Sequence, residues 1–124
     1  MKVLIIDDDP VALTLADAVL RGLGHEVVTR DRALGTSAAI IDERPDVALI
    51  DIEMPGLAGD ELVRIVRKRE FAFGRNETAF IFHSGRGRAE LDQLVEETGA
   101  LGAIDKASGP SGLARQFSEL VSKR

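Results

Sequence analysis

The sequence predicts an α/β domain built on a doubly wound, five-stranded parallel sheet with five helices. Three observations support this prediction. Strand-like and helix-like hydrophobic periods alternate five times along the chain, which is the pattern of parallel strands joined by right-handed helical crossovers. The first strand-like segment, residues 3–6, is entirely apolar, as expected of a strand buried on both faces. With 124 residues, 44% of them hydrophobic, the chain can form one compact core but not two.

The first two strand–helix units have recognisable boundaries. After the first strand, Asp9 and Pro10 are typical of a helix N-cap and of a proline in the first turn. Apolar residues then recur at helical spacing from residue 12 to residue 23. Residues 26–29 predict a short second strand, and a weaker helix follows that stops before Pro45. We expect the buried face of this helix to carry Leu34, Ala38 and Ile41.

The remaining elements follow the same alternation. Residues 47–52 predict a third strand that is interrupted by one charge, Asp51, and residues 54–59 predict a loop. Strands are expected again at residues 79–82 and 103–104. The helices between and after them carry apolar stripes at Leu62, Ile65 and Val66, at Leu91, Leu94 and Val95, and at Leu113, Phe117, Leu120 and Val121.

Polar residues follow the predicted strands, at the edge of the sheet where α/β proteins bind their ligands. The first strand ends in Asp7 and Asp8, the third in Asp51, the fourth in Ser84 and the fifth in Lys106. Three clustered carboxylates repel one another unless a cation neutralises them. Oxygen ligands with room for water suit Mg²⁺, with Mn²⁺ as an alternative. The sequence therefore predicts a metal site formed by the three aspartates.

These residue types together are suited to phosphoryl transfer. The carboxylate of Asp51 can attack phosphorus and form an acyl phosphate, and it needs no base because it has no proton to lose. A metal ion and Lys106 would neutralise the equatorial oxygens, and Ser84 would donate a hydrogen bond to one of them. We therefore expect Asp51, Ser84 and Lys106 to be the catalytic residues.

Four fragments give the chain its resemblance to a known family. "LIIDDDP", "DVALIDIEMPG", "IFHSG" and "GAIDK" occur in the order of the receiver domains of two-component response regulators, and the chain resembles these domains, including the chemotaxis regulators, over nearly its whole length. The resemblance implies a flavodoxin-like sheet with strand order 2-1-3-4-5. It also implies that Asp51 is the phosphoacceptor and that Asp7, Asp8, Asp51 and the backbone carbonyl of Glu53 hold Mg²⁺.

The resemblance further implies a function and partners. Similar domains take a phosphoryl group from a phosphohistidine on a sensor histidine kinase or a histidine phosphotransfer protein. They catalyse their own phosphorylation and dephosphorylation but are not conventional turnover enzymes. Three residues depart from the family pattern and imply a different output route: Ala58 replaces an acidic residue, Ala103 replaces a bulky switch residue, and Ala107 replaces a proline.

Composition restricts the partners and the location. A net charge of -5 argues against direct nucleic-acid binding, which needs a clustered basic face. Apolar runs are too short to span a membrane, and the absence of cysteine fits a reducing compartment, so we expect a cytoplasmic protein. Residues 1–124 are expected to be a single receiver domain without an output domain. A downstream protein target and a weak homodimer are expected as further partners.

Two other classes of function stay open. A receiver-shaped interaction module that is not phosphorylated would typically lack a site residue, whereas this chain has them all. A small phosphatase of the aspartyl-phosphate type would need an aspartate two residues after its nucleophile, where this chain has Glu53.

Several residues near these motifs are expected to have a structural position but no role in the site. We expect His83 to lie at the surface, facing away from Ser84, because consecutive strand residues point to opposite faces. Arg86 and Arg88 are expected to be solvated, with attraction of an anionic partner as the alternative. Phe71 and Phe73 are expected to cover an edge of the core, with an exposed patch that meets a partner as the alternative.

Overall fold

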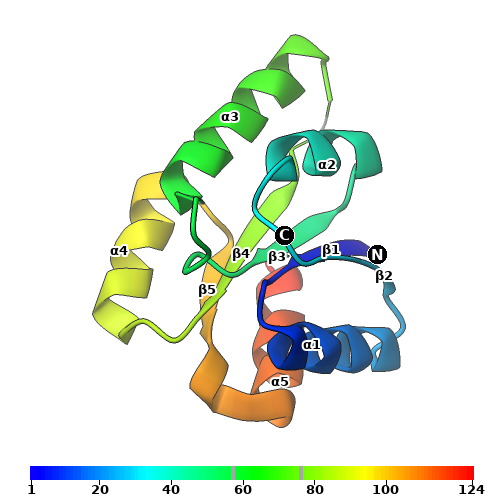
Figure 1. Cartoon of the computed structure of the whole chain (residues 1–124), viewed down its shortest axis with the longest axis vertical. Coiled ribbons are helices and arrows are strands. Elements are labelled where there is room, and N and C mark those ends of the chain that lie inside the picture. Colours follow the sequence, from blue (N-terminus) through cyan, green and yellow to red (C-terminus); the bar gives the residue numbers. More distant parts are fainter. Residues whose placement is uncertain (57, 76) are drawn as a thin grey trace.

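The computed structural model describes residues 1–56, 58–75 and 77–124. Within these residues the five strands are all parallel and lie in the order β2-β1-β3-β4-β5, which confirms the predicted fold (Figure 1). The elements are β1 (Lys2–Ile6), α1 (Pro10–Gly22), β2 (Glu26–Arg30), α2 (Thr36–Glu43), β3 (Val47–Ile50), α3 (Gly59–Ala72), β4 (Ala79–Ser84), α4 (Arg88–Thr98), β5 (Gly102–Asp105), a 3-10 helix η1 (Lys106–Ser108) and α5 (Gly109–Val121).

Alternating side chains divide the core into two layers, one on each face of the sheet. On one face, α1 and α5 pack against the sheet, and Leu20 and Phe117 lie among its side chains. On the other face, α2, α3 and α4 cover a layer that contains Phe80, Phe82 and Leu91 (Figure 1). Because helices cover both faces, every residue of β3 is buried.

The start of α1 follows the sequence prediction. The side chain of Asp9 accepts a hydrogen bond from the backbone N–H of Val11 at 3.0 Å, and Pro10 is the first helical residue. An N-cap of this kind satisfies one of the free N–H groups of the first turn. Asp9 is therefore a helix cap.

Three details of the predicted elements are wrong. The strand β3 ends at Ile50, one residue before Asp51. Leu34 is 85% exposed, because Gly35, with φ of 79°, directly precedes α2 and leaves Leu34 outside the helix. Ala38 is exposed as well, whereas Ile41 is buried as predicted, together with Ile40.

Phe71 and Phe73 do not cover the core. They are 90% and 62% exposed, although the sequence predicted that they shield its edge. The buried stripe of α3 runs through Val63, Val66 and Glu70, so the next residue, Phe71, points away from it.

A buried acid organises the connection from α3 to β4. The carboxylate of Glu70 accepts hydrogen bonds from the backbone N–H of Thr78 at 2.7 Å and from its hydroxyl at 2.9 Å. Arg67 donates to the same carboxylate at 2.9 Å, and its guanidinium lies over the ring of Phe80. Glu70 is thereby fully paired although it is almost inaccessible to solvent.

The two ends of the chain lie at the amino edge of the sheet. Asp46, just before β3, exchanges two hydrogen bonds of 2.8 Å with the backbone of Lys2. Its carboxylate also lies 3.7 Å from the guanidinium of Arg124. Lys2 begins β1 and Arg124 ends the chain, so Asp46 lies next to both termini.

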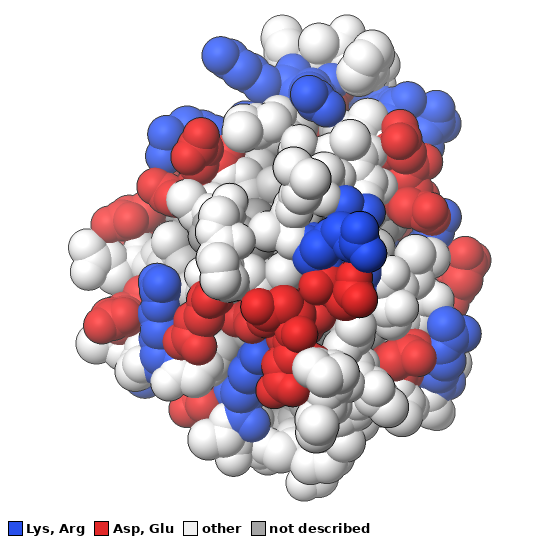
Figure 2. Space-filling model, in the orientation of Figure 1, with Lys and Arg blue, Asp and Glu red and all other residues white. Residues whose placement is uncertain are grey.

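The surface carries interspersed charges. On the face shown in Figure 2, acidic side chains form a continuous patch near the middle, and basic side chains lie in separate groups around it. None of the helices in the described residues is long and apolar enough to cross a membrane.

Candidate functional site

Two aspartates are positioned by adjacent strands of the sheet. In the parallel register Ile6 lies opposite Ile50, so Asp7 and Asp51 leave the sheet at the same level. The ladder continues for one more step, because the N–H of Asp51 donates to the carbonyl of Ile6 at 2.9 Å. Both side chains are buried, and the next residue, Asp8, is exposed. One carboxylate oxygen from each of the three aspartates lies within 4.8 Å of the others.

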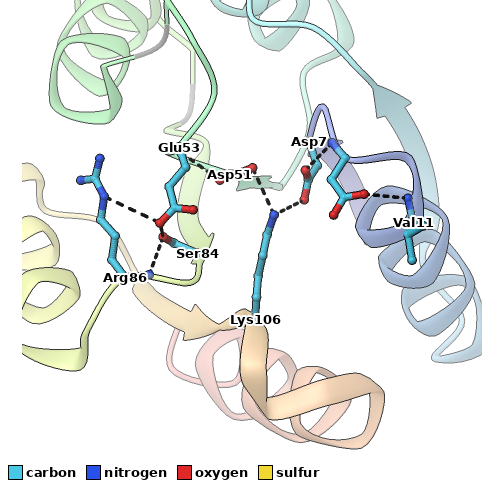
Figure 3. Close-up of polar contacts among 8 residues, drawn as sticks. Asp7, Val11, Asp51, Glu53, Ser84, Arg86 and Lys106 are labelled. Carbon is cyan, nitrogen blue, oxygen red and sulfur yellow. Dashed lines mark hydrogen bonds and ion pairs between the residues drawn. The ribbon is translucent and has the colours of Figure 1, made fainter.

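The ammonium group of Lys106 lies between the two buried carboxylates (Figure 3). Its Nζ is 2.8 Å from Oδ2 of Asp7 and 3.1 Å from Oδ2 of Asp51. Lys106 follows β5 directly, at the first position of η1, so the fifth strand carries the cation to the same crevice. One ammonium thus neutralises part of a cluster of three acids, and the cluster keeps a net negative charge.

The pKa values reflect this shared ion pair. Burial raises the pKa of Asp7 above 3.8, and the repulsion of Asp51 adds to it, while Lys106 and the N–H of Asp9 oppose the shift. The pKa of Lys106 is also raised, because its two carboxylate partners outweigh the effect of its own burial. For Asp7, the single ammonium does not fully offset the cost of burial. For Lys106, the two carboxylates more than offset it.

The donor set suits a hard divalent cation. All three converging side chains offer carboxylate oxygens, and Asp8 remains open to solvent, so ligating waters have room. Asp7, Asp8 and Asp51 therefore fit the Mg²⁺ or Mn²⁺ site predicted from the sequence. The contribution of the Glu53 carbonyl stays a prediction.

Ser84 reaches the crevice, but its hydroxyl is bound elsewhere. At the end of β4 it is fully buried, and Oγ donates to Oε1 of Glu53 at 3.0 Å. Oγ also accepts from the backbone N–H of Arg86 at 3.1 Å. The backbone N–H of Glu53 in turn donates to Oδ1 of Asp51 at 2.9 Å. Sequence reasoning missed this role of the Glu53 side chain, because no periodic pattern signals a contact between two loops.

Arg88 is not merely solvated, as the sequence suggested. Its Nη1 donates to the backbone carbonyl of Ala103 at 3.2 Å, and its other guanidinium nitrogens bind Asp92 at 2.8 and 3.0 Å. The start of α4 is therefore connected to β5 at Ala103, where the family resemblance predicts a bulky switch residue. Ala103 itself is buried.

His83 is buried, with only 8% of its surface exposed, which corrects the prediction of a surface residue. It lies on β4, between the neighbouring strands β3 and β5, and its side chain is on the same face of the sheet as buried Ile81. Burial and the positive charge of Lys106 lower the pKa of His83 to about 4, despite the opposing effect of Asp51. The imidazole is therefore neutral at pH 7.

Comparison with known proteins assigns the chain to a family. The family model of the response regulator receiver domain matches residues 3–117. The chain belongs to this receiver domain family. It is 30% identical over 125 residues to the virulence sensor protein BvgS of Bordetella pertussis, and this alignment covers 99% of the chain and 10% of BvgS. It is 37% identical over 67 residues to protein PilH of Pseudomonas aeruginosa, and this alignment covers 54% of the chain and 55% of PilH.

Solved receiver structures have the same fold. The chemotaxis response regulator CheY4 of Vibrio cholerae superposes with a TM-score of 0.80 at 27% identity, covering 96% of this receiver domain and 97% of CheY4. The receiver domain of the putative response regulator NarL from Mycobacterium tuberculosis gives a TM-score of 0.81 at 25% identity, with coverages of 99% and 97%. This receiver domain spans about a tenth of the length of the BvgS proteins that it matches.

Proposed function

We propose that this receiver domain accepts a phosphoryl group from a phosphohistidine on the carboxylate of Asp51. The observation that supports the proposal is the shared ion pair: a buried carboxylate at a strand end, bound by the ammonium of Lys106 beside two further acids. The donor would be a sensor histidine kinase or a histidine phosphotransfer protein, and phosphorylation would switch or relay a signal to a protein target.

The site residues have separate roles in the proposed reaction. An oxygen of Asp51 forms the new bond to phosphorus, while the phosphorus–nitrogen bond of the donor breaks and its electron pair leaves with the imidazole. Asp51 needs no base, because it is already a carboxylate. Lys106 is close enough to follow the incoming negative charge, since its Nζ lies 3.1 Å from Oδ2 of Asp51. Ser84 would donate its hydroxyl proton to a phosphoryl oxygen.

A divalent cation completes the proposed site. Asp7, Asp8 and Asp51 would hold Mg²⁺, with the Glu53 carbonyl as a further ligand, and the ion would neutralise negative charge on the phosphoryl oxygens. Lys106 binds the two buried aspartates that would become ligands, so the ammonium and the ion would share these carboxylates.

The proposal is tested by intact mass measurement after incubation with acetyl phosphate, with and without Mg²⁺. We expect the wild type to gain one phosphoryl group only with Mg²⁺, and Asp51→Asn to gain none. Asp42→Asn, which removes an exposed carboxylate from α2, is the matched control and should behave as the wild type. No gain by folded wild-type protein under any condition would refute the proposal.

A further inference from the structure

The hydroxyl of Ser84 is fully committed in this structure. A serine hydroxyl has one proton to donate, and here it goes to Oε1 of Glu53 at 3.0 Å. The oxygen accepts the N–H of Arg86 at 3.1 Å, and the side chain is shielded from solvent. In the proposed reaction the same proton must go to a phosphoryl oxygen on Asp51. The two hydrogen bonds exclude each other, because there is only one proton.

We propose that Glu53 is a positioning residue that holds the Ser84 hydroxyl away from the phosphoacceptor, so that phosphoryl uptake requires this bond to break. This inference rests on the proposed function of Asp51. We name the Glu53–Ser84 hydrogen bond the Ser84 latch. The latch slows uptake by keeping the hydroxyl unavailable until the Glu53 carboxylate moves.

Repulsion between a phosphoryl group on Asp51 and the Glu53 carboxylate would open the latch. The backbone N–H of Glu53 donates to Oδ1 of Asp51 at 2.9 Å, so the Glu53 side chain begins next to the acceptor. A phosphoryl dianion on Asp51 would repel the Glu53 carboxylate. The arrival of the phosphoryl group therefore weakens the bond that holds Ser84, and it offers the freed hydroxyl a stronger, charged acceptor.

The structure also provides a place for Glu53 to go. Nε of Arg86 lies 4.0 Å from Oε1 of Glu53, and both side chains are 44% exposed. The carboxylate can turn toward water while it keeps Arg86 as a partner. Figure 3 shows Glu53, Ser84 and Arg86 as one group of contacts on the far side of Asp51 from Asp7. The latch can open without disturbing the ion pair between Asp7 and Lys106.

A double-mutant cycle tests the latch, because it isolates effects of Glu53 that act through Ser84. The rate constant of phosphoryl uptake from acetyl phosphate is measured at saturating Mg²⁺ for the wild type, Glu53→Ala, Ser84→Ala and the double variant. We expect Glu53→Ala to be about tenfold faster than the wild type, the scale of one charge-assisted hydrogen bond. In the Ser84→Ala background, the same change should alter the rate less than about twofold.

Conservative variants separate the hydrogen bond from the charge. Glu53→Gln keeps an oxygen that can accept the Ser84 proton but carries no charge, so its rate should lie between those of the wild type and Glu53→Ala. Glu96→Gln, an equal charge change on the exposed side of α4, is the control and should leave the rate unchanged. Circular dichroism and urea unfolding verify that each variant is folded.

The outcomes distinguish the latch from the phosphoacceptor proposal. The latch is overturned if the wild type is phosphorylated and Glu53→Ala is not faster. It is also overturned if the acceleration persists in the Ser84→Ala background, because Glu53 then acts through its charge alone. Absence of uptake by both the wild type and Glu53→Ala overturns both proposals.

Discussion

Replacing Lys106 by methionine should destabilise this receiver domain at neutral pH. The substitution keeps the length of the side chain but removes the ammonium that lies 2.8 Å from Asp7 and 3.1 Å from Asp51. Removing one partner of a buried ion pair typically costs about 3–5 kcal/mol. The Lys106 side chain is 23% exposed, so water reaches the crevice and reduces the penalty. We therefore expect the free energy of unfolding at pH 7 to fall by about 2–3 kcal/mol.

The loss should depend on pH in a defined direction. Burial already raises the pKa of Asp7, and Lys106 is the largest opposing influence, so the variant should raise this pKa further. A raised carboxylate pKa means that ionisation costs stability above that pKa, and that the cost disappears as the pH falls through it. The difference between the variant and the wild type should therefore shrink on acidification.

Urea unfolding followed by circular dichroism, at pH 7 and at a mildly acidic pH, measures both effects. Lys68→Met, which removes an exposed ammonium from α3, is the matched control and should have little effect. Mg²⁺ should restore part of the lost stability of Lys106→Met, because the proposed metal ligands then bind a cation again. Equal stability of Lys106→Met and the wild type at pH 7 would refute this reasoning, and so would a loss that is the same at both pH values.

Further predictions concern single residues. Glu70→Ala should lower the free energy of unfolding by about 3 kcal/mol, because the buried N–H and hydroxyl of Thr78 lose their acceptor; a loss below about 1 kcal/mol in urea unfolding would contradict this. His83 has a pKa of about 4 in the folded protein and about 6.5 when unfolded, so the unfolded state takes up its proton first as the pH falls. The free energy of unfolding should therefore fall by about 3 kcal/mol between pH 6.5 and pH 4. His83→Leu should remove this part of the acid sensitivity, and identical pH profiles of the two proteins would disprove it. Asp8→Asn should raise the Mg²⁺ concentration needed for uptake of the phosphoryl group, and an unchanged Mg²⁺ titration would exclude Asp8 as a ligand. Phe71→Ser should change the free energy of unfolding by less than about 0.5 kcal/mol, since the ring is 90% exposed, and a larger loss would show that the ring packs.

The sequence predicted the acidic crevice because its geometry follows from strand register. In a parallel sheet, residues that follow neighbouring strand ends come close together, as Asp7 and Asp51 do after β1 and β3. Lys106 follows β5, on the far side of β4, and its long side chain reaches both carboxylates. Periodicity located the strands well enough that the two-residue error at the end of β3, predicted to end at residue 52 but ending at Ile50, did not move Asp51 away from the crevice. Asp9 was predicted as a cap because the local pattern of an acid followed by proline has a local cause.

The parts that could not be predicted depend on loops and on rotamers. The contact of Glu53 with Ser84 requires two connections, from different strands, to place two side chains 3.0 Å apart. The left-handed conformation of Gly35 sets the start of α2 and therefore its buried face, and a glycine in a sequence does not reveal its φ angle. His83 was misplaced because the predicted fourth strand ended at residue 82, whereas β4 continues to Ser84 and His83 is buried within it.

The position of Asp46 has a consequence for how the domain can be combined with other sequences. Asp46 lies next to both Lys2 and Arg124, at the edge of the sheet opposite the acidic crevice. A polypeptide fused to either terminus therefore starts on the side that faces away from the crevice, and it does not have to pass over it. A sequence similar to this chain occurs within a longer polypeptide in BvgS, where the match covers 99% of this chain and 10% of BvgS.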